Sequence, residues 1–276
     1  MGHQPLNQQA IAIIVFDIDG VVRDVGNSYR RALADTVEQF TDGAYRPSQA
    51  DIDALKTEGV WNNDWEASEE MVYRYFETQG RSRTEINLSY TDLVDFFQRR
   101  YRGSNLDHPD QWDGYICQEP LLLEPTYLQG LTQAGMPWGF FSGATRGSAA
   151  YVLERRLGLK APVLVAMEDA PGKPDPTGLL AAVQQLTTQQ TLPPALPVVY
   201  VGDTVADMQT VQMASQQDQT RTWVGIGILP PHAQAPLDYA IAYSNTLNHA
   251  GAVDVLKNVQ ELTPEAVRHL VKELKA

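Results

Sequence analysis

The chain has 276 residues, 43% of them hydrophobic, and a formal net charge of −13. This length is enough to bury a core without disulfide or metal staples, and it predicts one large domain or a core with an insert. The acidic excess argues against a nucleic-acid partner, because such proteins concentrate Lys and Arg. No run approaches the ~18 apolar residues of a membrane span, so we expect no membrane partner. Composition does not indicate an oligomeric state.

The N-terminal region and the cysteine content point to the cytoplasm. A single cysteine, Cys117, excludes an intrachain disulfide and is typical of a reducing compartment. It could be a nucleophile, but a buried small side chain is the commoner case. The apolar run at residues 11–16 lacks a basic flank and ends in Asp17, unlike a signal peptide.

Short apolar runs alternate with helical patterns along most of the chain. Residues 11–16 read as a buried parallel strand, and similar runs follow at 138–141, 163–167, 198–201 and 223–228. Helical patterns lie between them at 149–157, 179–186 and 206–214. This alternation predicts an α/β fold, a Rossmann-like doubly wound parallel sheet with helices on both faces. Ligands bind such sheets at the carboxyl ends of the strands.

The stretch from 24 to 118 breaks this alternation. Three apolar helical stripes occur in it, at residues 29–40, 71–76 and 93–101, and no convincing strand pattern lies among them. We therefore predict an α-helical domain of residues 24–118, inserted into a core formed by residues 1–23 and 119–276. A final helix is predicted from Thr263, an N-cap that Pro264 follows at the first helical position.

The first chemical signal is Asp17-Ile18-Asp19-Gly20, directly after the first predicted strand. Residues i and i+2 of an extended segment project to the same side, so both carboxylates can face one ligand. One could attack as a nucleophile while the other acts as acid and base. For an isolated motif of this kind, a plain acidic turn is the commoner explanation.

A second cluster, Ser142-Gly143-Ala144, follows the second predicted strand. A hydroxyl and backbone N–H groups near a helix start can bind an anion. A serine that only caps the helix explains the same residues.

Two further clusters carry charge. Lys173 lies between Gly172 and Pro174, and a lysine in a stiff loop can offer a fixed positive charge to phosphate, although most lysines are surface residues. Asp203 and Asp207 follow the strand predicted at 198–201, and two carboxylates at a strand-to-helix junction can hold a hard cation. A helix cap with a solvated second aspartate is the structural alternative.

In this order, at four strand ends, the clusters resemble the haloacid dehalogenase superfamily of hydrolases. The matching residues are Asp17 and Asp19 of the first motif, Ser142 of the second, the basic Lys173, and Asp203 and Asp207 of the Gly-Asp-x-x-x-Asp motif. The helical insert resembles the α-helical C1 cap of subfamily IA. Residues 17–32 and Asn62-Asn63-Asp64-Trp65 are similar to a small branch of that subfamily common in cyanobacteria.

The resemblance implies a Mg²⁺-dependent phosphatase that acts on a small phosphorylated metabolite. Asp17 would form an aspartyl-phosphate, and Asp19 would protonate the leaving alcohol and then activate water. The implied Mg²⁺ ligands are the Asp17 and Asp203 carboxylates and the Asp19 backbone carbonyl, with Asp207 in or near the shell. Lys173 and the Ser142 segment, with the N–H groups of Gly143 and Ala144, would bind the phosphoryl oxygens.

Three other functions are compatible with parts of this pattern. Haloacid dehalogenation needs neither the metal nor a second acid, and the intact Asp19, Asp203 and Asp207 argue against it. A sugar phosphomutase shares all four motifs. A non-catalytic binding protein on the same fold usually lacks one of the acids or the lysine, and here all are present.

The substrate contacts are the least specific prediction. Candidates for leaving-group contacts are Arg23 at the hinge before the insert, Asn62 and Asn63 between Trp61 and Trp65, and Arg146 after the Ser142 cluster. For each of them a packing, capping or surface role is an equal alternative.

Overall fold

The computed structural model describes residues 10–273, which form two compact units. Of the described residues, 10–23 and 121–273 make up the first, which we call the core unit, and Asp24–Pro120 make up the second, the helical unit. The prediction placed the insert at residues 24–118, so the observed helical unit ends two residues later.

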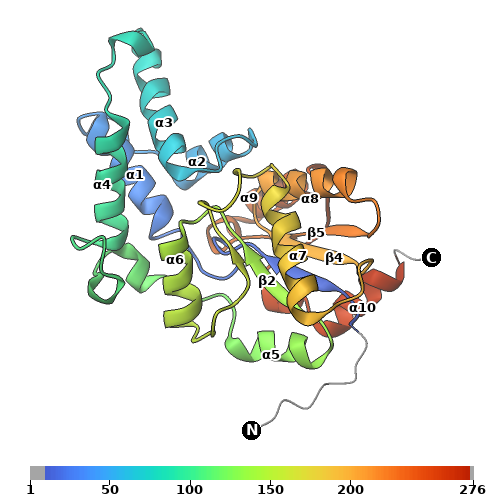
Figure 1. The fold of residues 1–276 in the computed structure, drawn as a ribbon. Coiled ribbons are helices and arrows are strands. Elements are labelled where there is room, and N and C mark those ends of the chain that lie inside the picture. The colour runs from blue at the N-terminus through green and yellow to red at the C-terminus, as the bar shows by residue number, and fades with distance from the viewer. Residues whose placement is uncertain (1–9, 274–276) are drawn as a thin grey trace. The chain divides into compact units, whose positions relative to one another are not determined.

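The core unit is built on a six-stranded parallel sheet with the order β3-β2-β1-β4-β5-β6. Figure 1 labels three of these strands, β2, β4 and β5. Its strands are β1 Ile13–Phe16, β2 Trp138–Phe141, β3 Leu164–Val165, β4 Val198–Gly202, β5 Trp223–Ile228 and β6 Ala252–Leu256. β1 lies between β2 and β4, where Phe16 is aligned with both Phe140 and Val201. The predicted α/β class with a parallel sheet is confirmed.

Five of the six strands were predicted, and the differences follow from burial. β2 and β5 have the predicted bounds, whereas β3 is confined to Leu164–Val165 within the predicted run. β6 was missed because it is an edge strand whose residues Val253 and Asp254 are exposed. Such a strand lacks the continuous apolar run that marks a strand buried on both faces.

Six helical segments accompany the sheet: α5 Pro125–Gln133, α6 Arg146–Ala150, α7 Thr177–Gln190, α8 Val205–Gln217, α9 Leu237–His249 and α10 Pro264–Glu273. The helical pattern predicted at 149–157 is confirmed in outline, but the helix starts earlier, at Arg146, and passes from α6 into π-helical turns over Tyr151–Arg156. There the Leu157 N–H bonds the Val152 carbonyl five residues back, at 2.9 Å. α5 and α9 were not predicted.

Both faces of the sheet are covered, which explains the uninterrupted apolar sequence of β1. Ile14 and Phe16 face side chains from α5, α6 and α10, whereas Ile13 and Val15 face side chains from α7 and α8. All four are fully buried. Because successive strand residues point to opposite faces, a strand between two helical layers must be apolar at every position.

The helical unit contains α1 Tyr29–Phe40, α2 Gln49–Lys56, α3 Asp64–Thr78 and α4 Tyr90–Arg102. Its core includes the Tyr29 ring, whose centroid lies 5.0 Å from that of Phe97 and 4.3 Å from that of Tyr101. The prediction found three of these helices and missed α2. Among the described residues no helix is long and apolar enough to cross a membrane.

Short 3₁₀ turns complete the described chain, at Arg83–Glu85, Pro109–Gln111, Tyr115–Gln118, Pro231–Ala233 and Val259–Glu261.

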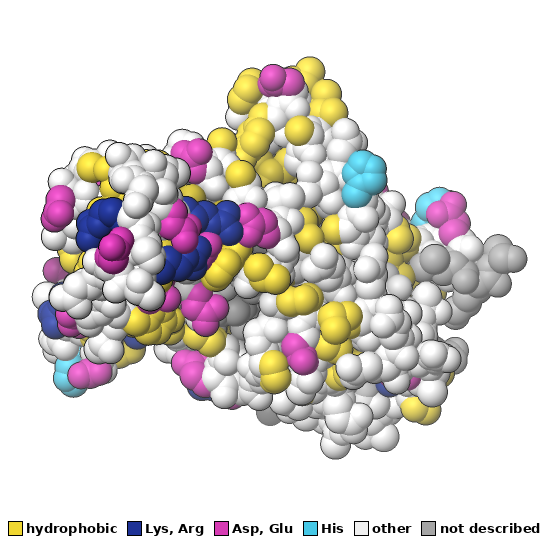
Figure 2. Space-filling view, turned by 90° about the horizontal axis from the view of Figure 1, so that it is seen from above, with side chains coloured by type: hydrophobic (Ala, Val, Ile, Leu, Met, Phe, Trp, Pro, Cys, Tyr) yellow, Lys and Arg dark blue, Asp and Glu magenta, His cyan; other side chains and the backbone are white. Residues whose placement is uncertain are grey.

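Many charges of the helical unit are paired. Arg74 bonds Glu58 at 2.6 Å, and Arg83 bonds Glu70 at 2.8 Å. Figure 2 shows Lys and Arg side chains among Asp and Glu side chains at the left of the face it draws. The Arg74–Glu58 pair is exposed on both sides and worth little stability, whereas Glu70 is buried.

Candidate active site

The four predicted clusters lie at one edge of the core sheet. Asp17 follows β1, Ser142 follows β2, and Asp203 follows β4, at the carboxyl ends of three neighbouring parallel strands. The Asp17 N–H bonds the Val201 carbonyl at 2.8 Å, so Asp17 is tied to the strand that carries Asp203. The parallel topology therefore brings together residues that are up to 186 positions apart.

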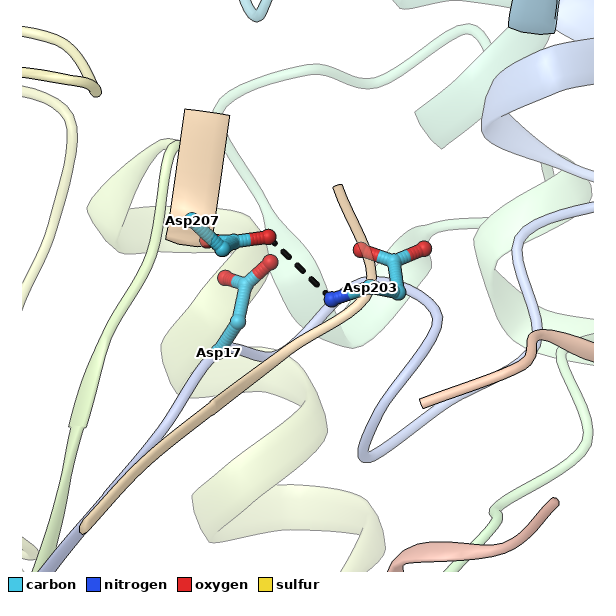
Figure 3. Close-up of side chains that lie close together, drawn as sticks. All are labelled: Asp17, Asp203 and Asp207. Carbon is cyan, nitrogen blue, oxygen red and sulfur yellow. Dashed lines mark hydrogen bonds between the residues drawn. The ribbon is translucent and has the colours of Figure 1, made fainter. Parts of the chain in front are cut away.

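Three buried carboxylates meet at this edge. One oxygen from each of Asp17, Asp203 and Asp207 lies within 4.8 Å of the other two, and Figure 3 shows them on the ends of β1 and β4 and the start of α8. Their exposed fractions are 6%, 6% and 0%. Carboxylates at such distances in a poorly solvated place repel one another unless cations neutralise them.

Lys173 supplies one positive charge to these three carboxylates. Its Nζ lies 2.9 Å from Asp17 Oδ1 and 2.6 Å from Asp207 Oδ1, and it sits over the rings of Phe141 and Tyr200 at 5.2 and 5.4 Å from their centroids. Burial lowers the pKa of Lys173, but Asp17 and Asp207 together raise it further, so the net shift is upward. Lys173 is therefore a fixed, buried positive charge at neutral pH.

A single lysine does not neutralise the three acids. Burial raises the pKa of Asp17 from 3.8 to about 7; Lys173 opposes the shift, and the charges of Asp207 and Asp19 add to it. A cation bound here would favour ionised Asp17. The donor set of carboxylate oxygens fits a hard divalent ion such as Mg²⁺.

Asp207 differs from the other two acids in its hydrogen bonds. Its Oδ1 accepts from Lys173 at 2.6 Å and from the Tyr200 hydroxyl at 2.9 Å. Its Oδ2 accepts from the Asp203 N–H at 3.2 Å and from the Thr204 N–H and hydroxyl at 2.9 and 2.6 Å. Burial raises the pKa of Asp207, but Lys173 and Thr204 lower it more. Asp207 thus holds both the lysine and the turn that carries Asp203.

The glycines of the first and last motifs make room for these acids. At Gly20, where φ is +77°, an added Cβ would collide with the Asp203 carboxylate. At Gly202 it would collide with the Asp207 side chain. Both glycines are therefore needed for the close approach of neighbouring segments at this edge.

Ser142 is almost fully buried at the end of β2. Its Oγ accepts from the Ala144 N–H at 3.1 Å, and its own N–H bonds the Val165 carbonyl at 3.0 Å. Ala144 is buried and Gly143 is half-buried. The serine therefore stabilises its own turn, and its hydroxyl proton is available for a further acceptor.

The second acid of the first motif, Asp19, is bound by Arg23. Arg23 Nε lies 2.6 Å and Nη2 2.5 Å from Asp19 Oδ1. The Asp19 side chain is 23% exposed, whereas Arg23 is fully buried. Arg23, a candidate substrate contact from the sequence, is here a partner of Asp19.

Comparison with known proteins identifies the family. The model of the haloacid dehalogenase-like hydrolases matches residues 11–214, a span that contains all four clusters. This chain belongs to that family. The predicted membership of the haloacid dehalogenase superfamily is thereby confirmed, together with the prediction of a hydrolase.

Solved structures agree with this haloacid dehalogenase-like fold. A phosphonoacetaldehyde hydrolase-like protein from Oleispira antarctica has a TM-score of 0.67 at 15% identity, covering 99% of each chain. A family hydrolase from Deinococcus radiodurans with bound phosphate and sodium has a TM-score of 0.60 at 18% identity, covering 96% of this chain and 98% of that one. At these identities the likeness establishes the fold alone.

A curated relative is more similar in sequence. It is described as the imidazoleglycerol-phosphate dehydratase of Phytophthora nicotianae and is 27% identical over 253 residues, or 89% of this chain. The haloacid dehalogenase-like chain spans about half the length of that protein.

The remaining candidate contacts have local partners. The Arg146 guanidinium pairs with Asp169, and the Arg146 backbone N–H donates to Glu168 Oε2 at 2.8 Å. In the helical unit of this hydrolase, Asn63 Oδ1 accepts from the Trp65 N–H at 3.0 Å and so caps α3. This capping is the structural alternative considered for that loop, and neighbouring Asn62 is half-buried.

Sequence reasoning missed two tyrosines of the hydrolase site. Tyr200 is fully buried in β4 and bonds Asp207, and the Tyr243 hydroxyl of α9 donates to the Asp203 carbonyl at 3.0 Å. A phenol within the apolar run Val-Val-Tyr-Val could have revealed Tyr200, because a buried hydroxyl requires a partner. Tyr243 does not lie in such an apolar run, so the sequence carries no comparable indication of a hydrogen-bonded hydroxyl there.

Proposed function

We propose that this haloacid dehalogenase-like hydrolase is a Mg²⁺-dependent phosphatase that cleaves small phosphomonoesters through an aspartyl-phosphate on Asp17. The observation that carries the proposal is the buried cluster in which Lys173 bonds both Asp17 and Asp207 beside Asp203. A carboxylate that attacks a phosphoryl group must overcome the repulsion of like charges, and this cluster is arranged to bind balancing cations.

The residues that would hold Mg²⁺ are the Asp17 and Asp203 carboxylates and the Asp19 backbone carbonyl. When bound, the ion supplies positive charge to the phosphoryl oxygens and to Asp17. We assign Asp207 a supporting role, because each of its oxygens already accepts at least two hydrogen bonds.

In the first half-reaction, an oxygen of Asp17 forms a bond to phosphorus while the ester P–O bond breaks. Lys173, the Ser142 hydroxyl and the Gly143 N–H hold the phosphoryl oxygens in line with Asp17, and the Ala144 N–H, which bonds Ser142 Oγ, keeps that turn in shape. Asp19 donates its proton to the departing alcohol oxygen, so the alcohol leaves neutral.

In the second half-reaction, water attacks the phosphorus of the aspartyl-phosphate. Asp19, now ionised, accepts the proton of that water, and the bond between phosphorus and the Asp17 oxygen breaks. Inorganic phosphate leaves and both aspartates return to their starting states. The net reaction converts one phosphomonoester and one water into an alcohol and phosphate.

The helical unit is proposed to act as the cap domain that selects the leaving group. The Deinococcus radiodurans hydrolase with bound phosphate supports a phosphorylated substrate. The description of the Phytophthora nicotianae relative names an imidazole-bearing phosphate ester. We therefore place imidazole-bearing alcohol phosphates in the first substrate panel, beside sugar phosphates, phosphoglycolate and phosphorylated amino alcohols.

The test is phosphate release from this panel by the purified chain. Activity should disappear with a chelator, return with Mg²⁺ and be inhibited by Ca²⁺, which takes more oxygen ligands at longer distances. Asp17→Asn is the matched inactive control. Full activity in excess chelator would contradict the metal dependence, and an isomer without free phosphate would identify a phosphomutase instead.

A further inference from the structure

Arg23 is a buried cation attached to the proposed acid and base. It is fully buried, and its Nε and Nη2 both reach Asp19 Oδ1, at 2.6 and 2.5 Å. A buried guanidinium is costly unless it is paired, so its position beside Asp19 is strongly constrained. At full burial, Arg23 does not offer a surface to a substrate.

Backbone hydrogen bonds of the turn at residues 18–23 hold Arg23 close to Asp19. The Ile18 carbonyl accepts the N–H groups of Val22 at 2.8 Å and Arg23 at 3.2 Å, and the Gly20 N–H bonds the Arg23 carbonyl at 2.9 Å. Isolated β-bridges also pair the Arg23 backbone with that of Asp19 in parallel and with that of Leu121 in antiparallel orientation. The backbone of Arg23 is therefore fixed, and its guanidinium needs little reorganisation to hold the Asp19 carboxylate.

We propose that Arg23 is a positioning residue that orients the Asp19 carboxyl group for both proton transfers. Arg23 Nε donates a hydrogen bond to Oδ1, and Nη2 lies 2.5 Å from the same oxygen as an ion pair. Among the described residues no other side chain bonds the Asp19 carboxylate, so Oδ2 remains for the proton exchanged with the leaving oxygen and then with water. The inference rests on the proposed phosphatase function. It adds that Arg23 acts through Asp19 and not through the substrate.

The leaving group provides the first test. An alkyl phosphate needs a proton on its leaving oxygen, whereas an aryl phosphate with a good leaving group does not. Arg23→Met should lower kcat for the alkyl substrate by roughly 10-fold or more, part of the ~10²–10⁴ that a positioned acid contributes. The formation of phosphoenzyme from the aryl substrate should change by less than about 3-fold. Equal losses on both substrates would overturn the proposal.

A double-mutant cycle tests whether Arg23 acts through Asp19. In an Asp19→Asn background the carboxylate is gone, so adding Arg23→Met should change alkyl phosphate turnover by less than about 2-fold. If the second substitution costs as much there as in the wild type, Arg23 acts independently of Asp19 and the proposal is wrong.

Two variants separate positioning from folding. Arg23→Lys keeps the charge but lacks the fork, so it should retain the fold with an intermediate loss that is again larger for alkyl substrates. Arg30→Met removes another buried arginine, paired with Asp53 in the helical unit, and should leave the alkyl-to-aryl ratio unchanged. A normal ratio in Arg23→Lys together with a folded, normal-ratio Arg23→Met would refute the inference. A wild-type chain inactive on all phosphomonoesters would instead refute the proposed function.

Discussion

Lys173 Nζ lies 2.6 Å from Asp207 Oδ1, and both side chains are buried at the carboxyl edge of the sheet. The lysine comes from the loop before α7 and the aspartate from the first turn of α8, so the pair joins two segments that are separate in the sequence. A buried pair of this kind costs more to break than a surface pair, because the remaining charge has no water to replace its partner.

The nucleophile is the most direct prediction. Asp17→Asn should lower phosphate release on the order of 10³-fold or more, since an amide of nearly the same shape cannot attack phosphorus. Beryllofluoride should bind the wild type and protect it from thermal unfolding, but not the variant. Retention of a tenth of the wild-type turnover would rule out the covalent mechanism.

Asp203 and Asp207 should respond differently to the same substitution. Asp203→Asn should raise the Mg²⁺ concentration needed for half-maximal activity, and calorimetry should show weaker Mg²⁺ binding, without a loss of stability. Asp207→Asn should lower the free energy of unfolding by about 3 kcal/mol, because Lys173 then loses a charged partner. Urea unfolding of both variants checks the contrast, and the reverse pattern would exchange the two assigned roles.

Asn63→Ala tests the cap of α3. The Asn63 side chain satisfies the Trp65 N–H at the start of the helix, so its removal should lower the free energy of unfolding by about 1 kcal/mol. Hydrolysis of alkyl and aryl phosphates should then fall in parallel, if at all. A selective loss on the alkyl substrate, with an unchanged melting temperature, would show that Asn63 contacts the leaving group.

The pKa of Asp17 predicts a pH-dependent stability for the metal-free protein. Burial raises that pKa from 3.8 to about 7, so the folded chain binds this proton more tightly than the unfolded chain does. The contribution to stability is complete below about pH 4 and is lost as the pH rises through about 7. In chelator, wild type should therefore lose stability relative to Asp17→Asn over this range. Identical urea-unfolding profiles at pH 4 to 7.5 would contradict the raised pKa.

The amino-acid sequence determined the sheet class, most strands and the position of each chemical cluster along the chain. Runs such as Val198–Gly202 can be recognised as strands in the sequence, because a strand between two helical layers must be apolar throughout. The order of Asp17, Ser142, Lys173 and Asp203 identified the family, because each follows a strand of one parallel sheet. The edge strand β6 escaped prediction, since Val253 and Asp254 are exposed and carry no such pattern.

The partners of the site residues were decided only by the tertiary structure. The resemblance placed Asp207 only in or near the metal shell, and the hydrogen bonds from Lys173 and Tyr200 in the folded chain support a structural role for it. Arg23 likewise reads as a candidate substrate contact until its full burial against Asp19 is known. Burial and hydrogen-bond partners depend on segments far apart in sequence, and these set the cost of each charge and so its role.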